Sequence, residues 1–415
     1  MAHAPQITLT EADTKLPARM IAAGPKALIA GFALLAVGGL AAGFDLHRLG
    51  FAYLTAFAFW LTLALGGLVF LCLQHVSRAG WSVGVRRMIE NVVSTIPWLF
   101  LASLPIVVPT AMGSDFFYHW NAEATIDFDR QHMPAKVPVY KMFLNNTFWT
   151  VRVLFYFTVW SLLARFFVGH SRSQDSDGDH TRTRKMEVLA APGILLFALT
   201  LTFAGIDFLM SLDPHWFSTI WGVYLFAGAM TSFLSFLALM LMWLQKQGAL
   251  TKAITAEHYH DIGKFMFGFV FFFGYIGFSQ YLLIWYANIP EETVFYKHRQ
   301  EGDWVAFSLL LLFGHFLIPF LGLISRHVKR HKPSLAFWAV WLLVMHFIDM
   351  FWIVMPSYAE HAGSPDKIHF GPENVAVWLG LGGLFLWRVL AKSGQGSVVP
   401  LRDPRLSESL QFENI

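Results

Sequence analysis

Ten long apolar blocks separate the polar stretches of this 415-residue sequence, and they constrain its fold more than any other feature. Most reach the roughly 20 residues that a helix needs to cross a hydrocarbon core about 30 Å thick. Only 14% of the residues are charged, against about a quarter in soluble domains. The expected spans are residues 27–44, 51–75, 89–111, 146–168, 188–210, 217–244, 262–287, 304–326, 335–357 and 374–391.

A backbone inside a membrane must satisfy its own hydrogen bonds, which leaves only helices and closed β-barrels. The sequence does not show the short alternating segments of a barrel. The predicted fold class is therefore an all-α integral membrane protein with ten transmembrane helices. The predicted organisation is an N-terminal segment (1–26), a transmembrane domain (27–391) and a C-terminal tail (392–415).

An even number of spans places both termini on one side of the membrane, and most Lys and Arg residues of the loops lie on that side. The positive-inside rule then predicts cytoplasmic termini. The net charge is only +3 and the basic residues are scattered, so membrane lipids rather than nucleic acid are the expected partners. The polar stretch 170–185 is expected to be a mobile linker.

The single cysteine, Cys72, lies inside the second span, where a small buried residue is expected. One cysteine excludes an internal disulfide, a CxxCH haem attachment and a cysteine-held iron-sulfur cluster in this chain. No P-loop or Rossmann glycine pattern follows a strand, which argues against nucleotide hydrolysis. We expect no metal site and no catalytic residue in this chain, and no cofactor bound covalently or through cysteine.

The stretch DFLMSLDPHWF, which begins at Asp207, places two carboxylates at the join between the fifth and sixth spans. Asp213 followed by Pro214 is typical of a helix start. Asp207 falls in the last turn of a span, where the helix dipole disfavours a carboxylate. Arg152, at similar depth in the fourth span, is a candidate ion-pair partner on a proton route. The alternative is that both side chains reach water or headgroups separately.

Deeper in the chain, His315 lies in the eighth span, and His346 and Asp349 share a helix face in the ninth. Three interpretations remain open. The residues could form a proton relay in which the carboxylate tunes an imidazole. The two histidines could ligate a b-type haem, or they could be packing residues with hydrogen bonds to the backbone.

Lys264 and Tyr275 lie on one stripe of the seventh span and are candidates for the cytoplasmic part of the same proton path. A lysine that extends to the membrane surface and a tyrosine that packs explain the stripe equally well.

Prolines interrupt the third span at Pro97 and Pro105 and the eighth at Pro319. Broken helices at corresponding places are typical of secondary transporters with inverted repeats. A proton-coupled transporter with inverted five-helix repeats is therefore the alternative function. Gly39 and Gly43 have the spacing of a close helix contact.

Three stretches carry a resemblance to a known family: MSLDPHWFSTIWGVYLFAG, FSQYLLIWYANIPEET and DPRLSESLQFEN. They resemble the ActF membrane subunits of bacterial alternative complex III, which are similar to the NrfD or polysulfide-reductase type of membrane subunit. The resemblance covers nearly the whole chain. It implies two four-helix bundles, formed by spans two to five and six to nine, with spans one and ten at the side.

The same resemblance implies a function. Such complexes in the bacterial inner membrane oxidise quinol and pass electrons to a cytochrome c or an oxidase through subunits that hold haem c and iron-sulfur clusters. The larger ActC paralogue is thought to hold the quinol, and ActF is thought to scaffold the assembly and to carry protons. The resemblance therefore implies partners with haem c and iron-sulfur clusters, and a quinone near this chain.

Overall fold

The computed structural model describes residues 8–132 and 137–414, so the first seven residues of the predicted N-terminal segment and the last residue of the predicted tail lie outside it. Among the described residues there is no strand. Ten helical segments in this part are long and apolar enough to cross a membrane. The predicted fold class, an all-α membrane protein, is confirmed.

The spans follow the chain in the predicted order. They are α2 (Ala18–Ala41), α3 (Leu46–Val76), α4 (Val83–Val93) with α5 (Ile96–Ala111), α8 (Asn146–Asp177), α9 (Thr181–Phe208), α10 (Trp221–Lys246), α11 (Ala256–Ala287), α13 (Trp304–Leu310) with the π-helical turn η3 (Leu311–Leu317) and α14 (Ile318–Leu323), α16 (Lys332–His361) and α17 (Pro372–Ser393). The short elements are α1 (Glu11–Thr14), η1 (His119–Asn121), α6 (Glu123–His132), α7 (Val137–Phe143), η2 (Met210–Leu212), α12 (Pro290–His298), α15 (Arg326–Arg330) and α18 (Leu406–Leu410).

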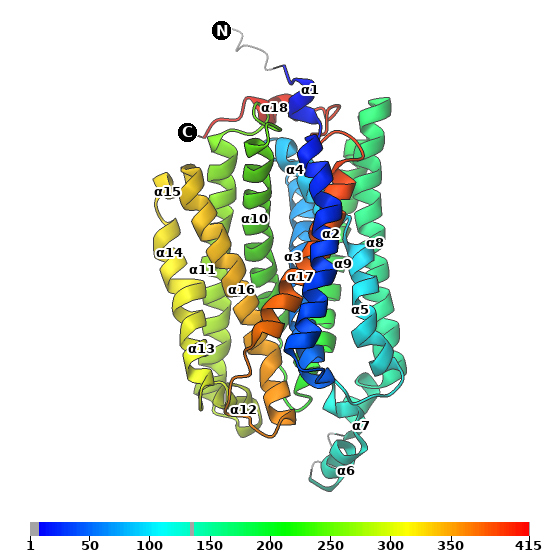
Figure 1. Cartoon of the computed structure of the whole chain (residues 1–415), viewed down its shortest axis with the longest axis vertical. Coiled ribbons are helices and arrows are strands. Elements are labelled where there is room, and N and C mark those ends of the chain that lie inside the picture. The colour runs from blue at the N-terminus through cyan, green and yellow to red at the C-terminus, as the bar shows by residue number, and fades with distance from the viewer. Residues whose placement is uncertain (1–7, 133–136, 415) are drawn as a thin grey trace.

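The spans form two four-helix bundles. Bundle 1 contains α3, α4–α5, α8 and α9, and bundle 2 contains α10, α11, α13–α14 and α16. The remaining spans, α2 and α17, pack along each other, and α17 also contacts α3. This is the predicted architecture. Figure 1 shows α1 and α18 at one end of the molecule, which we call the tail end, and α6, α7 and α12 at the opposite end.

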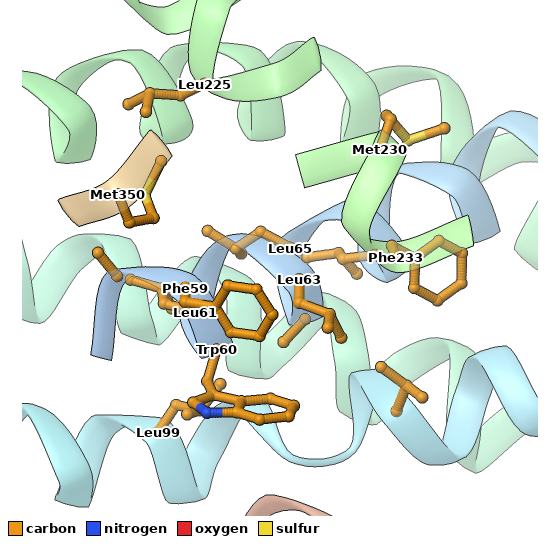
Figure 2. Close-up of a cluster of buried hydrophobic side chains, with 14 of the residues drawn as sticks. Phe59, Trp60, Leu61, Leu63, Leu65, Leu99, Leu225, Met230, Phe233 and Met350 are labelled. Carbon is orange, nitrogen blue, oxygen red and sulfur yellow. The ribbon is translucent and has the colours of Figure 1, made fainter. Parts of the chain in front are cut away.

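Helix α3 is the centre of the hydrophobic core. In its most hydrophobic stretch 89% of the residues are buried, against 28% for α11. Figure 2 shows side chains of α3, among them Phe59 and Leu65, between Leu99 of α5, Phe233 of α10 and Met350 of α16. Because α3 contacts α9 in bundle 1 and α10 and α16 in bundle 2, it joins the two bundles.

The close contact between α2 and α17 depends on glycine. A Cβ at Gly31 would lie 2.8 Å from the carbonyl oxygen of Gly380, and one at Gly383 would lie 2.6 Å from that of Ala27. Small residues at such sites let two helix backbones approach each other. The predicted contact through Gly39 and Gly43 is wrong, because Gly43 lies in the turn after α2 with a φ of +64° and nothing within 4 Å of its Cβ position.

Of the three prolines predicted to interrupt spans, Pro97 and Pro319 lie at irregularities and Pro105 does not. The third span breaks at Ser94 and Thr95, just before the first turn of α5, which contains Pro97, whereas Pro105 lies inside the continuous helix α5. In the eighth span, the π-helical turn η3 precedes Pro319. Proline has no N–H to donate to the carbonyl four residues earlier and clashes with it, so the helix widens or breaks on its N-terminal side.

Two local predictions are wrong. The stretch 170–185 is not a linker, since α8 continues to Asp177 and α9 begins at Thr181. The side chain of Arg182 pairs with Asp177 across this turn at 2.5 Å. Asp213 is not the cap of a helix, because α10 begins only at Trp221. Its carboxylate instead accepts a hydrogen bond from the N–H of His215 at 3.2 Å, within the loop.

At the tail end, a segment that follows the last span connects the two bundles. We call residues 399–414 the tail segment. Asp403 pairs with Arg86 of α4 at 2.5 Å, which fixes the segment to bundle 1. Ser409 makes a hydrogen bond of 3.1 Å with His258 of α11, which fixes it to bundle 2. The tail segment therefore lies across the ends of both bundles.

Candidate functional site

A cluster of polar side chains lies where bundle 2 meets α3. His346 and Asp349 come from α16, His315 from η3, Tyr224 from α10 and Thr62 from α3. Four of them are at most 4% exposed, and Tyr224 is 7% exposed. The structure thus brings together three residues predicted from sequence, and the cluster lies in the apolar interior, where polar groups are costly to bury.

Two hydrogen bonds orient the cluster. The Oγ1 of Thr62 and the Nε2 of His346 are 2.9 Å apart. Because the Thr62 hydroxyl is also placed to donate to the carbonyl of Ala58 at 2.8 Å, Nε2 is assigned as the donor to Thr62. The hydroxyl of Tyr224 donates to Oδ1 of Asp349. On this assignment His346 carries a proton on Nε2, and in the neutral ring Nδ1 is then an acceptor.

Several polar atoms of the cluster have no hydrogen-bond partner among the described residues. They are Nδ1 of His346, Oδ2 of Asp349 and both ring nitrogens of His315. The first two face each other at 3.9 Å, and the rings of His315 and His346 have centroids 6.3 Å apart. Buried groups of this kind usually have a partner. A proton carried by one of these two facing atoms needs only a small movement to reach the other.

Pro319 is the reason why His315 lies on a widened helical turn. The carbonyl four residues before this proline is that of His315 itself, which therefore loses its helical donor. Trp341 donates its indole N–H to the neighbouring carbonyl of Gly314 at 2.6 Å. The π-helical turn holds His315 against Phe273, at a ring distance of 4.0 Å. Such turns are often found at functional sites.

A polar route leads from the cluster toward the end opposite the tail end. Tyr296 and Arg299 are close enough to Tyr224 to interact with it electrostatically. Gln280 donates to the hydroxyl of Tyr296 at 2.8 Å, and Ser218 donates to Gln280 at 3.1 Å. Hydrogen bonds among the described residues thus join Tyr224 to Asp349, and Tyr296 to Gln280 and Ser218. None among these residues joins Tyr224 to Tyr296.

The guanidinium group of Arg299 lies in the same region and is fixed by backbone carbonyls. Its guanidinium donates to the carbonyls of Phe295 and Ile353 at 2.9 and 3.1 Å. Burial lowers the pKa of Arg299 to about 10, although Asp213 acts in the opposite direction. Burial also raises the pKa of Asp213, and the charge of Arg299 opposes this rise. Arg299, after α12, and Asp213, before α10, thus place a cation and a carboxylate that influence each other at the outer part of the route.

Arg152 and Asp207 form an ion pair in bundle 1, as the sequence suggested. Arg152 donates from Nε and Nη2 to the two carboxylate oxygens at 2.8 and 2.6 Å. Tyr156 donates to Oδ2 at 2.7 Å, and the remaining guanidinium donor reaches the carbonyl of Phe143 at 2.7 Å. The pair is saturated by neighbours from bundle 1 and from the adjoining helix α7. The geometry does not connect it to the cluster around His346.

Lys264 and Tyr275 are not brought to the cluster. Lys264 is half exposed, pairs with Asp261 and donates to Asn414 at 2.9 Å. Tyr275 is 55% exposed on the outer face of α11. Of the seven residues predicted from sequence, three therefore form the buried cluster, two form a separate ion pair and two lie on the outside.

The haem interpretation does not fit the site. Ligation would need a ring nitrogen of each histidine and a flat space for the macrocycle between them. The Nε2 of His346 is hydrogen-bonded to Thr62 and its Nδ1 faces Asp349 at 3.9 Å, while Phe273 lies against His315. Even one carbon added at Gly228 would be 2.9 Å from the His346 ring. Side chains fill the space that a porphyrin would occupy.

No known family model and no curated protein matches this chain. The class of protein is therefore defined by its fold, a multi-pass all-α membrane protein with an ionisable cluster in its interior.

Sequence reasoning missed five residues that complete the site: Thr62, Tyr224, Gln280, Tyr296 and Arg299. Gln280 carried a usable signal, because a single amide in an apolar span usually has a polar partner. Hydroxyl residues such as Thr62 are common in spans and do not stand out.

Proposed function

We propose that this chain is a membrane subunit of a quinol oxidoreductase complex of the alternative complex III type, and that bundle 2 conducts protons for it. The observation that carries the proton-conducting role is the buried group of Tyr224, Asp349, His346 and His315 with facing unpaired polar atoms. Ionisable residues inside a membrane typically mark ion or proton pathways.

A step in the proposed relay transfers a proton from the carboxyl group of Asp349 to Nδ1 of His346. The products are an Asp349 carboxylate and a His346 imidazolium, whose Nε2 proton stays hydrogen-bonded to Thr62. The transfer needs a small movement, because the two atoms that exchange the proton are 3.9 Å apart and a hydrogen bond requires about 3 Å or less. From Asp349, Tyr224 connects to the outer route through Tyr296.

The proposed location is the bacterial inner membrane, with the tail end in the cytoplasm. The basic residues of the loops support this orientation, because most lie on the side of both termini. The outer route then opens to the opposite, periplasmic side.

The proposed partners are an ActC-type paralogue and subunits that hold haem c and iron-sulfur clusters, with the quinone pool supplying electrons through the complex. The support is the resemblance of the three sequence stretches, two of which border the site: one contains Asp213 and Tyr224, the other Gln280. Purification from the native membrane in mild detergent tests this part. We expect haem c and iron-sulfur proteins in the same fraction, and a chain that purifies alone would contradict it.

The proton role is tested with two matched substitutions in the assembled complex. Tyr224→Phe removes a hydroxyl from the cluster, and Tyr275→Phe removes the same group from the lipid-facing side of α11. Each variant complex is reconstituted in liposomes and driven by quinol oxidation. We expect the Tyr224→Phe complex to lose most of its proton translocation while quinol oxidation continues. Tyr275→Phe should keep both activities. Equal proton translocation by the two variants would contradict the relay in bundle 2.

One observation favours the transporter alternative. Spans three and eight, which correspond in inverted five-helix repeats, are both irregular, at Ser94–Thr95 and at η3. A transporter should move a solute with a proton when it is reconstituted alone. Solute-dependent proton uptake by the isolated chain would favour this function over the first.

A further inference from the structure

A pocket of about 330 Å³ lies between the α4–α5 break, α8 and α17, toward the tail end. Four cationic side chains line it: Arg165, Arg172, Arg388 and Lys392. No carboxylate is among its lining residues. Trp98 forms part of the wall, with its ring centroid 5.0 Å from the guanidinium carbon of Arg388.

Most of this positive charge has no counter-charge within the described residues. Arg165 and Arg388 make no hydrogen bond or ion pair there, and Nε of Arg388 is buried without a partner. Lys392 donates only to the amide oxygen of Gln395, at 3.1 Å. A buried N–H without an acceptor, such as Nε of Arg388, is costly. The pocket is therefore suited to bind an anion.

The neighbouring ion-pair network does not supply this anion. Arg172 donates to Asn91 at 2.8 Å, beside two arginines and three carboxylates that pair among themselves: Arg86, Arg87, Glu90, Asp175 and Asp403. Counting Arg172, three positive charges face three negative ones. The three other cations of the pocket remain in excess.

The depth of the pocket matches the level of lipid phosphates. Arg165 is 19 residues after Asn146, the first residue of α8. At 1.5 Å per residue this is roughly 28 Å along the helix, close to the thickness of the hydrocarbon core. Arg165 and Gly169 are exposed, so the pocket opens on the side of the molecule. A tryptophan such as Trp98 is typical of this boundary.

We propose that this pocket binds the phosphodiester group of an anionic phospholipid, phosphatidylglycerol or cardiolipin. The phosphate lies between Arg165 and Arg388, whose planar guanidinium groups suit its oxygens. The acyl chain extends from the phosphate toward the membrane centre, past Ala164, which precedes Arg165 on α8. A lipid fits better than an acidic peptide because a peptide at the edge of the hydrocarbon core would leave backbone groups unpaired.

The test is native mass spectrometry of the purified full-length chain with phosphatidylglycerol and phosphatidylcholine of equal chain length. We expect wild type to prefer phosphatidylglycerol, and Arg165→Gln with Arg388→Gln to reduce this preference about 30-fold. The matched control is Lys246→Gln with Arg326→Gln, two exposed basic residues at the same end but on α10 and α15. The control should keep the preference, as should the conservative pair Arg165→Lys with Arg388→Lys.

Four results would overturn the proposal: equal binding of the two lipids by wild type, equal losses in the Gln pair and its control, full displacement of the lipid by millimolar inorganic phosphate, or an acidic segment of another subunit in the pocket of an assembled complex. If the Gln pair does not fold, Arg165→Gln alone changes only an exposed residue. It should still lower the preference about 5-fold.

Discussion

Replacing Thr62 by valine tests the orientation of the buried cluster. The side chain keeps its shape but loses the oxygen to which Nε2 of His346 donates. Thr55, two turns earlier on the same helix, supplies the control. It is also fully buried, and its hydroxyl donates only to its own helix, at the carbonyl of Phe51.

The difference between the two variants isolates one interaction. Both substitutions remove an intrahelical hydrogen bond, so this cost cancels. Only Thr62→Val also leaves the buried N–H of His346 without an acceptor, which costs about 1–3 kcal/mol. Moving the proton to Nδ1 would not compensate without a movement of the ring, because the acceptor that Nδ1 faces, Oδ2 of Asp349, is 3.9 Å away, beyond hydrogen-bond distance.

The assay is reversible denaturant unfolding of the purified chain in detergent, followed by tryptophan fluorescence. Thr62→Val should be less stable than Thr55→Val by about 1–3 kcal/mol. Replacing His346 by leucine in both backgrounds should remove most of that difference. If the two threonine variants unfold at the same denaturant concentration, the hydrogen bond does not hold His346 and the tautomer assignment fails.

Two further substitutions test other charged groups. Asp207→Asn breaks the buried pair with Arg152, and we expect a loss of about 3–5 kcal/mol in the free energy of unfolding; a thermal scan that shows no change would refute a structural role for the pair. Glu360→Gln removes the partner of His298 at 3.2 Å, and the hydrogen bond to Glu360 raises the pKa of this histidine. The stabilisation is present below about pH 6.5 and is lost as pH rises through the raised pKa, so wild type should exceed the variant by about 0.5 kcal/mol near pH 6 and by less near pH 9. A difference that does not vary with pH would contradict this assignment.

The architecture could be predicted because the length and hydropathy of a span follow directly from the thickness of the membrane. The pair of Arg152 and Asp207 could also be predicted, since depth along two consecutive antiparallel helices is fixed by residue count. The stretch 170–185 was predicted incorrectly because composition alone was used. Charged residues continue a helix well outside the membrane, as in α8, when ion pairs such as that of Asp177 and Arg182 support its end.

The face of each helix could not be predicted. In a soluble protein the polar side of a helix faces water, but in a membrane both the lipid side and the core side are apolar. Tyr275 of α11 and Tyr224 of α10 are therefore equivalent in the sequence, although the first faces outward and the second binds Asp349. The cluster also draws on four different helical segments, and no spacing within one segment reveals such a meeting.

The tail segment has a consequence for biogenesis. Its residues leave the ribosome after all ten spans have been translated, so each bundle must insert and fold before Asp403 and Ser409 can make their contacts. Until then other contacts, such as that between α3 and α10, hold the halves together. A chain cut short after α17 would contain all its spans but lack the contacts of the tail segment. Its two halves would separate more easily, which would make it a substrate for quality-control proteases.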